Sequence, residues 1–124
     1  MRLLLDTHVL LWWRAAAEPL SPRARAEIAD GNNEILVSVA SLWEITIKRS
    51  LGKLTFPDDL ESVLHEERFD LLPISLGQLR VLEGLPQLHR DPFDRLLVAQ
   101  ALAEDLPICS NDRRLAGYGA ALLW

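Results

Sequence analysis

The chain has 124 residues, of which 49% are hydrophobic and 25% are charged. This length and composition predict one globular domain over residues 1–124, and they exclude intrinsic disorder and a two-domain arrangement. The net charge of −5 disfavours a protein that grips nucleic acid through bulk positive charge, although local clusters of Lys and Arg leave room for a basic rim.

Short apolar runs alternate with helical patterns along the whole chain. In chain order, we expect strands at 2–5, 35–37, 71–74, 108–110 and 121–124, and helices at 7–16, 22–29, 39–51, 59–67, 76–84 and 92–104. Several helices begin with a capping residue, such as Ser21 or Ser75. The strands are continuously apolar, which is typical of strands covered on both faces. The alternation predicts a three-layer α/β/α fold around a mainly parallel sheet of about five strands.

The sequence favours a cytoplasmic protein without membrane contact. Apolar runs such as 9–13 are shorter than the roughly 18 residues of a membrane helix, and the first leucines are too few for a signal peptide. Cys109 is the only cysteine, so no disulfide forms within the chain, and its position in an expected strand predicts a buried side chain.

Four carboxylates are expected at one edge of the sheet, because ligands in parallel sheets bind outside the carboxyl ends of the strands. They are Asp6 after the first strand, Glu44 on the helix after the second, Asp94 at the start of the helix that leads to the fourth, and Asp112 after the fourth. Clustered negative charges favour a bound cation, and oxygen ligands select Mg²⁺ or Mn²⁺. This constellation predicts phosphodiester cleavage by a metal-activated water.

Some of these acids also have an ordinary structural explanation. Asp6 can cap the following helix, Asp112 can shape a turn, and Glu44 can pair with Lys48 four residues later. If all the acids play such roles, the chain is a non-enzymatic α/β interaction module.

Asp94 has the weakest structural explanation. Its helix is apolar nearly all round, so the carboxylate should be buried, and an ionised carboxylate is costly there unless it is paired or bound to a cation. Asp91, immediately before Pro92, is expected to be the cap of this helix. Glu44 borders an apolar stripe that includes Trp43 and Leu51, which predicts that it lies at the edge of buried surface.

Four segments resemble the successive motifs of PIN domains, and in particular those of VapC-type toxin ribonucleases. They are LLLDTHVLLWW (3–13), SVASLWEITIK (38–48), HRDPFDRLLVAQA (89–101) and SNDRRL (110–115). By this resemblance, Asp6, Glu44 and Asp94 match the three invariant acids of the family, and Asp112 matches a more variable fourth. Asp91 matches an additional acid of one subgroup, and Ser110 a small hydroxyl residue near the fourth acid.

The resemblance implies a PIN-like fold and a Mg²⁺- or Mn²⁺-dependent endoribonuclease that is the toxin of a bacterial toxin–antitoxin pair. It implies that Asp6, Glu44, Asp94 and Asp112 hold one or two ions, with Asp91 as an additional candidate ligand. It also implies inhibition by a VapB-type antitoxin, and commonly a homodimer. Family members differ in their RNA targets, so the resemblance implies RNA as the substrate without naming which RNA is cut.

RNA and antitoxin binding predict two further groups of residues. The candidates for a basic rim that attracts RNA, together with Ser110, are Lys48, Arg49, Arg90, Arg95, Arg113 and Arg114. Arg95 has an alternative role as an ion-pair partner of Asp91. Trp12 and Trp13 are adjacent on one helix and cannot both enter the same core, so at least one is expected at an antitoxin interface. The alternative is that both are half-buried at the edge of the domain.

Other protein classes have less support. A receiver domain would need an acidic pair after the first strand and a Lys near the fifth, whereas Thr7 follows Asp6 and no Lys follows Lys53. The chain contains no HExxH, GxSxG, Walker or GxGxxG pattern. We therefore expect no metal ligand among the three histidines, His8, His65 and His89.

Overall fold

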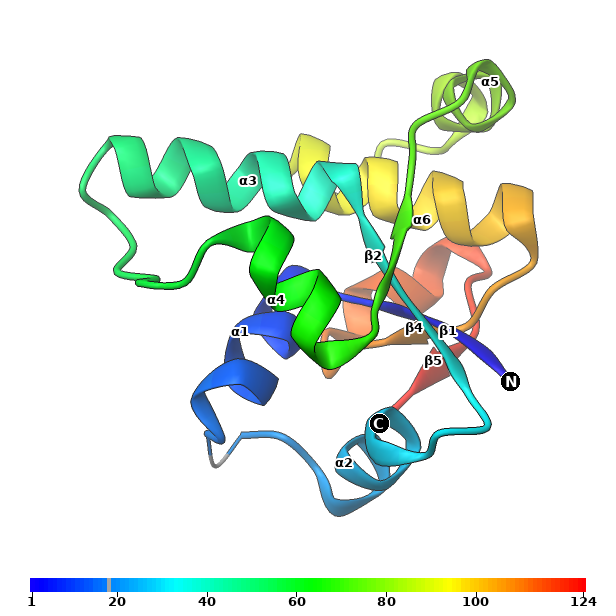
Figure 1. Ribbon diagram of the computed structural model, residues 1–124. Helices are drawn as coiled ribbons and strands as arrows, with labels where there is room; N and C mark the ends of the chain where they lie inside the picture. The colour runs from blue at the N-terminus through cyan, green and yellow to red at the C-terminus, as the bar shows by residue number, and fades with distance from the viewer. Residues whose placement is uncertain (18) are drawn as a thin grey trace.

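The computed structural model describes residues 1–17 and 19–124 (Figure 1). The elements in chain order are β1 (Arg2–Leu5), α1 (Thr7–Ala15), α2 (Pro22–Ala29), β2 (Glu34–Ser38), α3 (Val39–Ser50), α4 (Leu60–Glu67), β3 (Asp70–Leu72), α5 (Leu76–Gly84), α6 (Pro92–Glu104), β4 (Ile108–Cys109), the 3₁₀ helix η1 (Arg113–Tyr118) and β5 (Leu122–Leu123). The expected strands and helices are all present, and their ends shift by one or two residues. None of the described helices is long and apolar enough to cross a membrane.

The described strands form one parallel sheet in the order β3-β2-β1-β4-β5. From β1 in the centre, the chain builds outward through β2 to β3, and then returns to the other side of β1 to add β4 and β5. The reversal between β1 and β4 is a topological switch point, where sheets of this type bind their ligands. The predicted parallel α/β sheet is therefore confirmed.

Alternate side chains of the strands enter two separate cores. Leu3 and Leu5 of β1 pack in a cluster with residues of α1, α2 and α4, whereas Leu4 packs in a second cluster with α6 and η1. Figure 1 shows α1, α2 and α4 on one side of the sheet and α5 and α6 on the other. Because helices cover both faces, the strands are apolar on both faces, and the predicted three layers are confirmed.

The buried face of α3 differs from the predicted one. Trp43 and Leu51 are 54% and 61% exposed, so the predicted apolar stripe is wrong. The buried face instead carries Ala40, Ser41, Glu44 and Ile45. Small side chains at the start of the helix let it pack closely, which turns Glu44 inward to 4% exposure and leaves the large tryptophan outside.

The 3₁₀ helix η1 has no counterpart among the predicted elements. Its segment is short and lacks helical periodicity, so the sequence carries no hydrophobic signal for it. Local hydrogen bonds define its ends: Asp112 accepts from the backbone N–H of Arg114 at the start, and Gly119 ends it with φ 89°. That conformation is in the left-handed region, where glycine has no steric penalty.

A buried amide, Gln100, joins three elements of the second core. Its side-chain oxygen accepts a hydrogen bond from Ser38 Oγ at the end of β2. Its Nε2 donates to Gln78 Oε1 on α5, at 3.1 Å, and to the Pro73 carbonyl, at 3.4 Å. Because the Gln100 side chain is fully buried, these bonds are shielded from water.

We expect Gln100→Ala to lower the free energy of unfolding by ~2–4 kcal/mol, because it opens a cavity and removes partners from buried polar groups. Urea denaturation measures this loss. Gln87→Ala, at an exposed loop position, is the matched control. Equal stability of the two variants would contradict a role for this network.

Candidate active site

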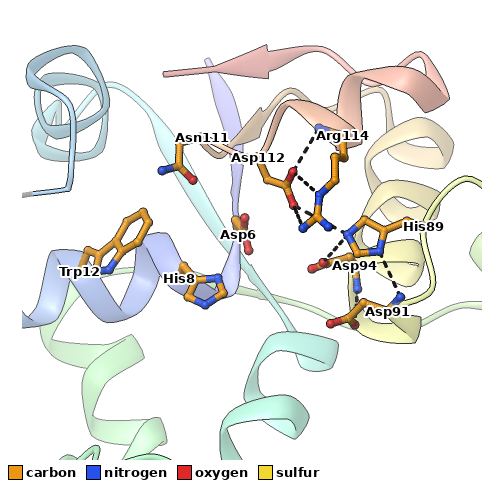
Figure 2. Close-up of a pocket in the computed structure, with 9 residues that line it drawn as sticks. All are labelled: Asp6, His8, Trp12, His89, Asp91, Asp94, Asn111, Asp112 and Arg114. Atoms are coloured by element: carbon orange, nitrogen blue, oxygen red, sulfur yellow. Dashed lines mark hydrogen bonds and ion pairs between the residues drawn. The ribbon is translucent and has the colours of Figure 1, made fainter.

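An open cavity of about 550 Å³ lies at the carboxyl ends of β1 and β4, at the switch point of the sheet (Figure 2). Its lining residues come from α1 and its cap, the segment before α6, α6 itself and the segment around the start of η1. They are Asp6, His8, Trp12, His89, Asp91, Asp94, Asn111, Asp112 and Arg114. Three of the four predicted ligands therefore line one cavity, together with Asp91.

Asp6 connects the two strands at the switch point. It follows β1 in an extended conformation, and its Oδ2 accepts a hydrogen bond of 2.7 Å from Ser110 Oγ, just beyond β4. Its side chain makes no capping hydrogen bond of regular geometry to α1 within the described part of the chain, so helix capping is not its main contact. Burial raises the pKa of Asp6, and the hydrogen bond from Ser110 partly opposes that rise.

Glu44 lies beside the cavity rather than in its lining. It is buried, and its Oε2 accepts a hydrogen bond of 2.7 Å from Lys48 Nζ, which confirms the predicted i,i+4 pair. Lys48 also experiences the charges of Asp91 and Asp94, which contribute to its raised pKa. Glu44 and its lysine therefore belong to the same electrostatic cluster as the cavity acids.

Asp94 has the most perturbed carboxyl group of the cluster. It lies in the first turn of α6, and its side chain is 20% exposed. Its pKa is raised to about 7. Burial has the largest effect, followed by the negative charges of Asp91, Asp6, Glu44 and Asp112. The position at the helix N-terminus stabilises an anion by only ~0.3–1 kcal/mol, which does not offset these effects. The site therefore holds several acids close enough to disfavour each other's ionisation.

Asp91 and Asp112 have the structural roles that the sequence also allowed. Asp91 Oδ1 accepts from the backbone N–H groups of Phe93, at 2.8 Å, and Asp94, at 3.2 Å, so the predicted cap of α6 is confirmed. Asp112 caps η1 and binds the Arg114 guanidinium through both oxygens, at 3.0 and 2.9 Å. This pairing holds the pKa of Asp112 below its usual range. Helix capping therefore explains two of the acids but neither Asp6 nor Asp94.

His89, which we did not expect among the metal ligands, lies inside the cluster. Its Nε2 is 3.2 Å from Asp94 Oδ2 and 3.8 Å from Asp112 Oδ2 (Figure 2). The three side chains can bring one ligand atom each within 4.8 Å of the others. Known metal-binding motifs with two closely spaced histidines do not include this group of one histidine and two aspartates, because its three residues come from separate segments. The available signal was the position of His89 two residues before the cap Asp91.

Some of the predicted basic residues have structural roles instead. Arg49 donates to the carbonyls of Phe56 and Asp58, and Arg95 donates to the Pro86 carbonyl and to Tyr118 Oη. The alternative Arg95–Asp91 ion pair is not formed among the described residues. Four candidates for the basic rim are exposed or half-buried and lie close in sequence to residues of the site. They are Lys48, Arg90, Arg113 and Arg114.

The adjacent tryptophans are both half-buried. Trp12 lines the cavity and packs edge-on against Trp124, with ring centroids 5.9 Å apart. Trp13 Nε1 donates a hydrogen bond of 2.7 Å to Glu67 on α4. Their burial matches the alternative of two half-buried rings at the domain edge, but only Trp12 reaches the cavity.

The donor set suits a hard divalent cation. The acids contribute oxygen atoms, which Mg²⁺ and Mn²⁺ prefer. Burial raises the pKa of Asp94, the neighbouring carboxylates raise it further, and a bound cation would lower it. Cys109 is buried and its pKa is raised to about 12 by burial, so the thiol is a core group and not a ligand.

Comparison with known proteins identifies the family. Ribonuclease VapC22 of Mycobacterium tuberculosis (strain ATCC 25618 / H37Rv) is 27% identical over 118 residues, which cover 93% of this chain and 90% of that protein. The fold is similar to VapBC2 from Rickettsia felis bound to a DNA fragment from its promoter, with a TM-score of 0.75 at 18% identity and coverage of 99% and 98% of the two chains. It is also similar to VapBC-1 from nontypeable Haemophilus influenzae, with a TM-score of 0.69 at 15% identity and coverage of 99% and 97%. The PIN domain family matches residues 3–120, and the chain therefore belongs to that family.

Proposed function

We propose that this protein is a Mg²⁺- or Mn²⁺-dependent endoribonuclease and the toxin of a toxin–antitoxin pair. The observation that carries the proposal is the group of carboxylates that line one cavity at the switch point, where burial and neighbouring acids raise the pKa of Asp94 to about 7. The relationship to a VapC ribonuclease supports RNA as the substrate.

In this proposal, Asp6, Glu44 and Asp94 hold the cation, and Asp112 contributes directly or through water. A divalent cation held by these residues would supply a Lewis acid that polarises the phosphodiester and lowers the pKa of a water molecule. Ser110 fixes the orientation of the Asp6 carboxylate through its 2.7 Å hydrogen bond. Asp91 caps α6 and thereby fixes the helix turn that carries Asp94.

The basic side chains bring the substrate to an acidic protein. Lys48 compensates Glu44 and lies within the field of the other acids. Arg113 and Arg114 follow the fourth acid directly and are exposed, and Arg90 is exposed before Asp91. We propose that these four residues contact phosphates of the RNA, whereas Arg49 and Arg95 stabilise the fold.

Metal-dependent cleavage of RNA tests the proposal. We expect the full chain to cut total cellular RNA at discrete positions with Mg²⁺ or Mn²⁺, and to lose this activity in EDTA. Asp6→Asn should also abolish it, whereas Cys109→Ala should retain it, because the mechanism needs no covalent nucleophile. Sequencing of the fragment ends measures both activity and specificity. Cleavage that persists in EDTA would contradict the metal mechanism.

We also propose a VapB-type antitoxin as partner and self-association into a homodimer. The similar structures from Rickettsia felis and Haemophilus influenzae are VapBC proteins, which supports such a partner. Trp12 offers a large half-buried ring at the rim of the cavity, and tryptophan is enriched at binding hot spots. Analytical ultracentrifugation of the chain alone measures the homodimer.

Trp12→Ala should weaken antitoxin binding by about 30-fold, or ~2 kcal/mol, because the ring borders the cavity that an inhibitor must cover. Isothermal titration with the co-expressed antitoxin measures the change. Trp43→Ala removes an exposed tryptophan that does not line the cavity, and it should bind as wild type does. If wild type, Trp12→Ala and Trp43→Ala bound the antitoxin with equal affinity, the proposed role of Trp12 in the interface would be contradicted.

A further inference from the structure

The side chain of His89 lies between two carboxylates that come from different segments. Its ring is buried, with 9% of the side chain exposed, and Nε2 lies between Asp94 Oδ2 and Asp112 Oδ2 (Figure 2). Within residues 1–17 and 19–124, Nε2 has no hydrogen bond of good geometry. A buried polar atom without a partner needs a physical explanation.

The other ring nitrogen defines the tautomer. Nδ1 of His89 accepts a hydrogen bond of 3.1 Å from the backbone N–H of Asp91. A nitrogen that accepts carries no proton, so the neutral ring carries its proton on Nε2. A protonated Nε2 has no free lone pair with which to bind a cation. Its N–H group faces two acceptors, the carboxylates of Asp94 and Asp112.

The backbone around His89 is held in place from the other side. The N–H of His89 donates a hydrogen bond of 2.7 Å to Tyr118 Oη, and Tyr118 is buried. Arg95 donates to the same hydroxyl, at 3.3 Å, and to the Pro86 carbonyl, at 2.7 Å. These contacts fix the segment that places the imidazole at the cluster.

We propose that His89 is a positioning residue whose Nε2–H faces Asp94 and Asp112 without a regular hydrogen bond to either, and that this polar contact holds the carboxylates together at the cation site without binding the cation. The inference rests on the proposed function for the cation itself. Asp94 belongs to α6 and Asp112 to the segment after β4, and their charges repel each other. The partial positive charge of the Nε2–H faces both carboxylates and offsets part of that repulsion. Arg114 holds Asp112 from its own segment, so His89 is the link to α6.

Nitrogen NMR of the wild-type chain tests the tautomer directly. Long-range ¹H–¹⁵N spectra of histidine-labelled protein distinguish a protonated Nε2 from a bare one. We expect a protonated Nε2 and a bare Nδ1 both without cation and at saturating Mg²⁺. Loss of the Nε2 proton on addition of Mg²⁺ would identify His89 as a ligand and overturn the proposal.

Two variants separate the functions of the two nitrogens. His89→Asn places an amide oxygen near Nδ1, so it keeps the acceptor for Asp91 but loses the distal donor. His89→Gln places an amide N–H near Nε2 and keeps the donor. Because groups that orient metal ligands typically affect affinity by 10–100-fold, we expect Mn²⁺ to bind His89→Asn about 10–100-fold more weakly than wild type. His89→Gln should recover most of the loss.

Calorimetric titration with Mn²⁺ measures these affinities, and thermal melting confirms that both variants are folded. Wild-type affinity in His89→Asn would overturn the proposal, as would equal losses in both variants. If the wild type binds Mn²⁺ but cleaves no RNA, the proposed function fails and the role of His89 is retained. If a variant does not fold, the NMR experiment on the wild type still decides the question.

Discussion

Replacing Asp94 with Asn is expected to reduce RNA cleavage by about 10²–10³-fold and, at the same time, to make the metal-free protein more stable. The loss of activity follows because the substitution removes an anionic oxygen from the proposed cation site. The gain in stability follows from the environment of the carboxylate. Burial raises the pKa of this carboxylate, and with the added effect of the neighbouring acids the pKa is about 7.

The sign of the pH dependence follows from this pKa. An Asp in the unfolded chain has a pKa of about 3.9, so between about pH 4 and pH 7 the folded state binds a proton that the unfolded state lacks. The contribution of Asp94 to stability therefore falls as the pH rises through this window. Above pH 7 the metal-free Asp94→Asn protein should be ~1–3 kcal/mol more stable than wild type, and at pH 4 the two should converge.

Urea denaturation in EDTA at acid and alkaline pH measures this difference. Asp70→Asn is a suitable control, because Asp70 is exposed at the amino end of β3, on the opposite edge of the sheet from the cavity. A stability difference between Asp94→Asn and wild type that does not grow with pH would contradict the assignment of Asp94 to a repulsive acid cluster.

The second large effect is expected at Arg14, which holds α1 against α4. Its guanidinium donates to Asp58, at 2.9 Å, to Glu66, at 2.6 Å, and to Glu67, at 2.7 Å. The side chain is 20% exposed, so solvent screens these ion pairs only in part. Arg14→Ala leaves three neighbouring carboxylates without their cation, and we expect the free energy of unfolding to fall by ~2 kcal/mol.

Arg14→Lys should recover only part of this loss, because a lysine keeps the charge but cannot direct separate N–H groups at three acceptors. The loss in Arg14→Ala should shrink at high salt, where the repulsion among the carboxylates is screened. Urea denaturation at two ionic strengths measures both effects. Arg23→Ala, at an exposed position on α2, is the control. If Arg14→Ala were as stable as this control, the cluster would have no role in joining the two helices.

The place of the site, at the carboxyl ends of the strands, could be predicted from the sequence because it depends on the order of strands and helices along the chain. Continuous apolar strands separated by helices require parallel pairing, and parallel pairing brings the carboxyl ends of the strands to one edge. Asp6, Asp94 and Asp112 then follow from their places beside β1, α6 and β4, and all three line the cavity. Their identity as cation ligands is still a proposal.

Packing between helices could not be predicted in the same way. The periodicity of α3 places Trp43 and Glu44 one position apart, and only the close approach of neighbouring elements decides which of them is buried. The position of His89 depends on Tyr118, which belongs to a 3₁₀ helix without a periodic signal. The wrong face of α3 and the unexpected place of His89 both concern contacts between distant segments, which a single sequence does not encode in its local pattern.

The hydrogen bond between Asp6 and Ser110 joins residues separated by 104 positions. Nearby, the carboxyl end of β1 pairs with β4 through Leu4 and Leu5. During synthesis, β1 is made early, but one of its edges stays open until β4 has left the ribosome. Contacts between such distant segments carry a large loop-closure entropy and form late in folding. A growing chain that has not reached Ser110 thus has no complete acid cluster. Cleavage at this site would therefore begin only after β1 and β4 have paired, which makes activity depend on a late step of folding.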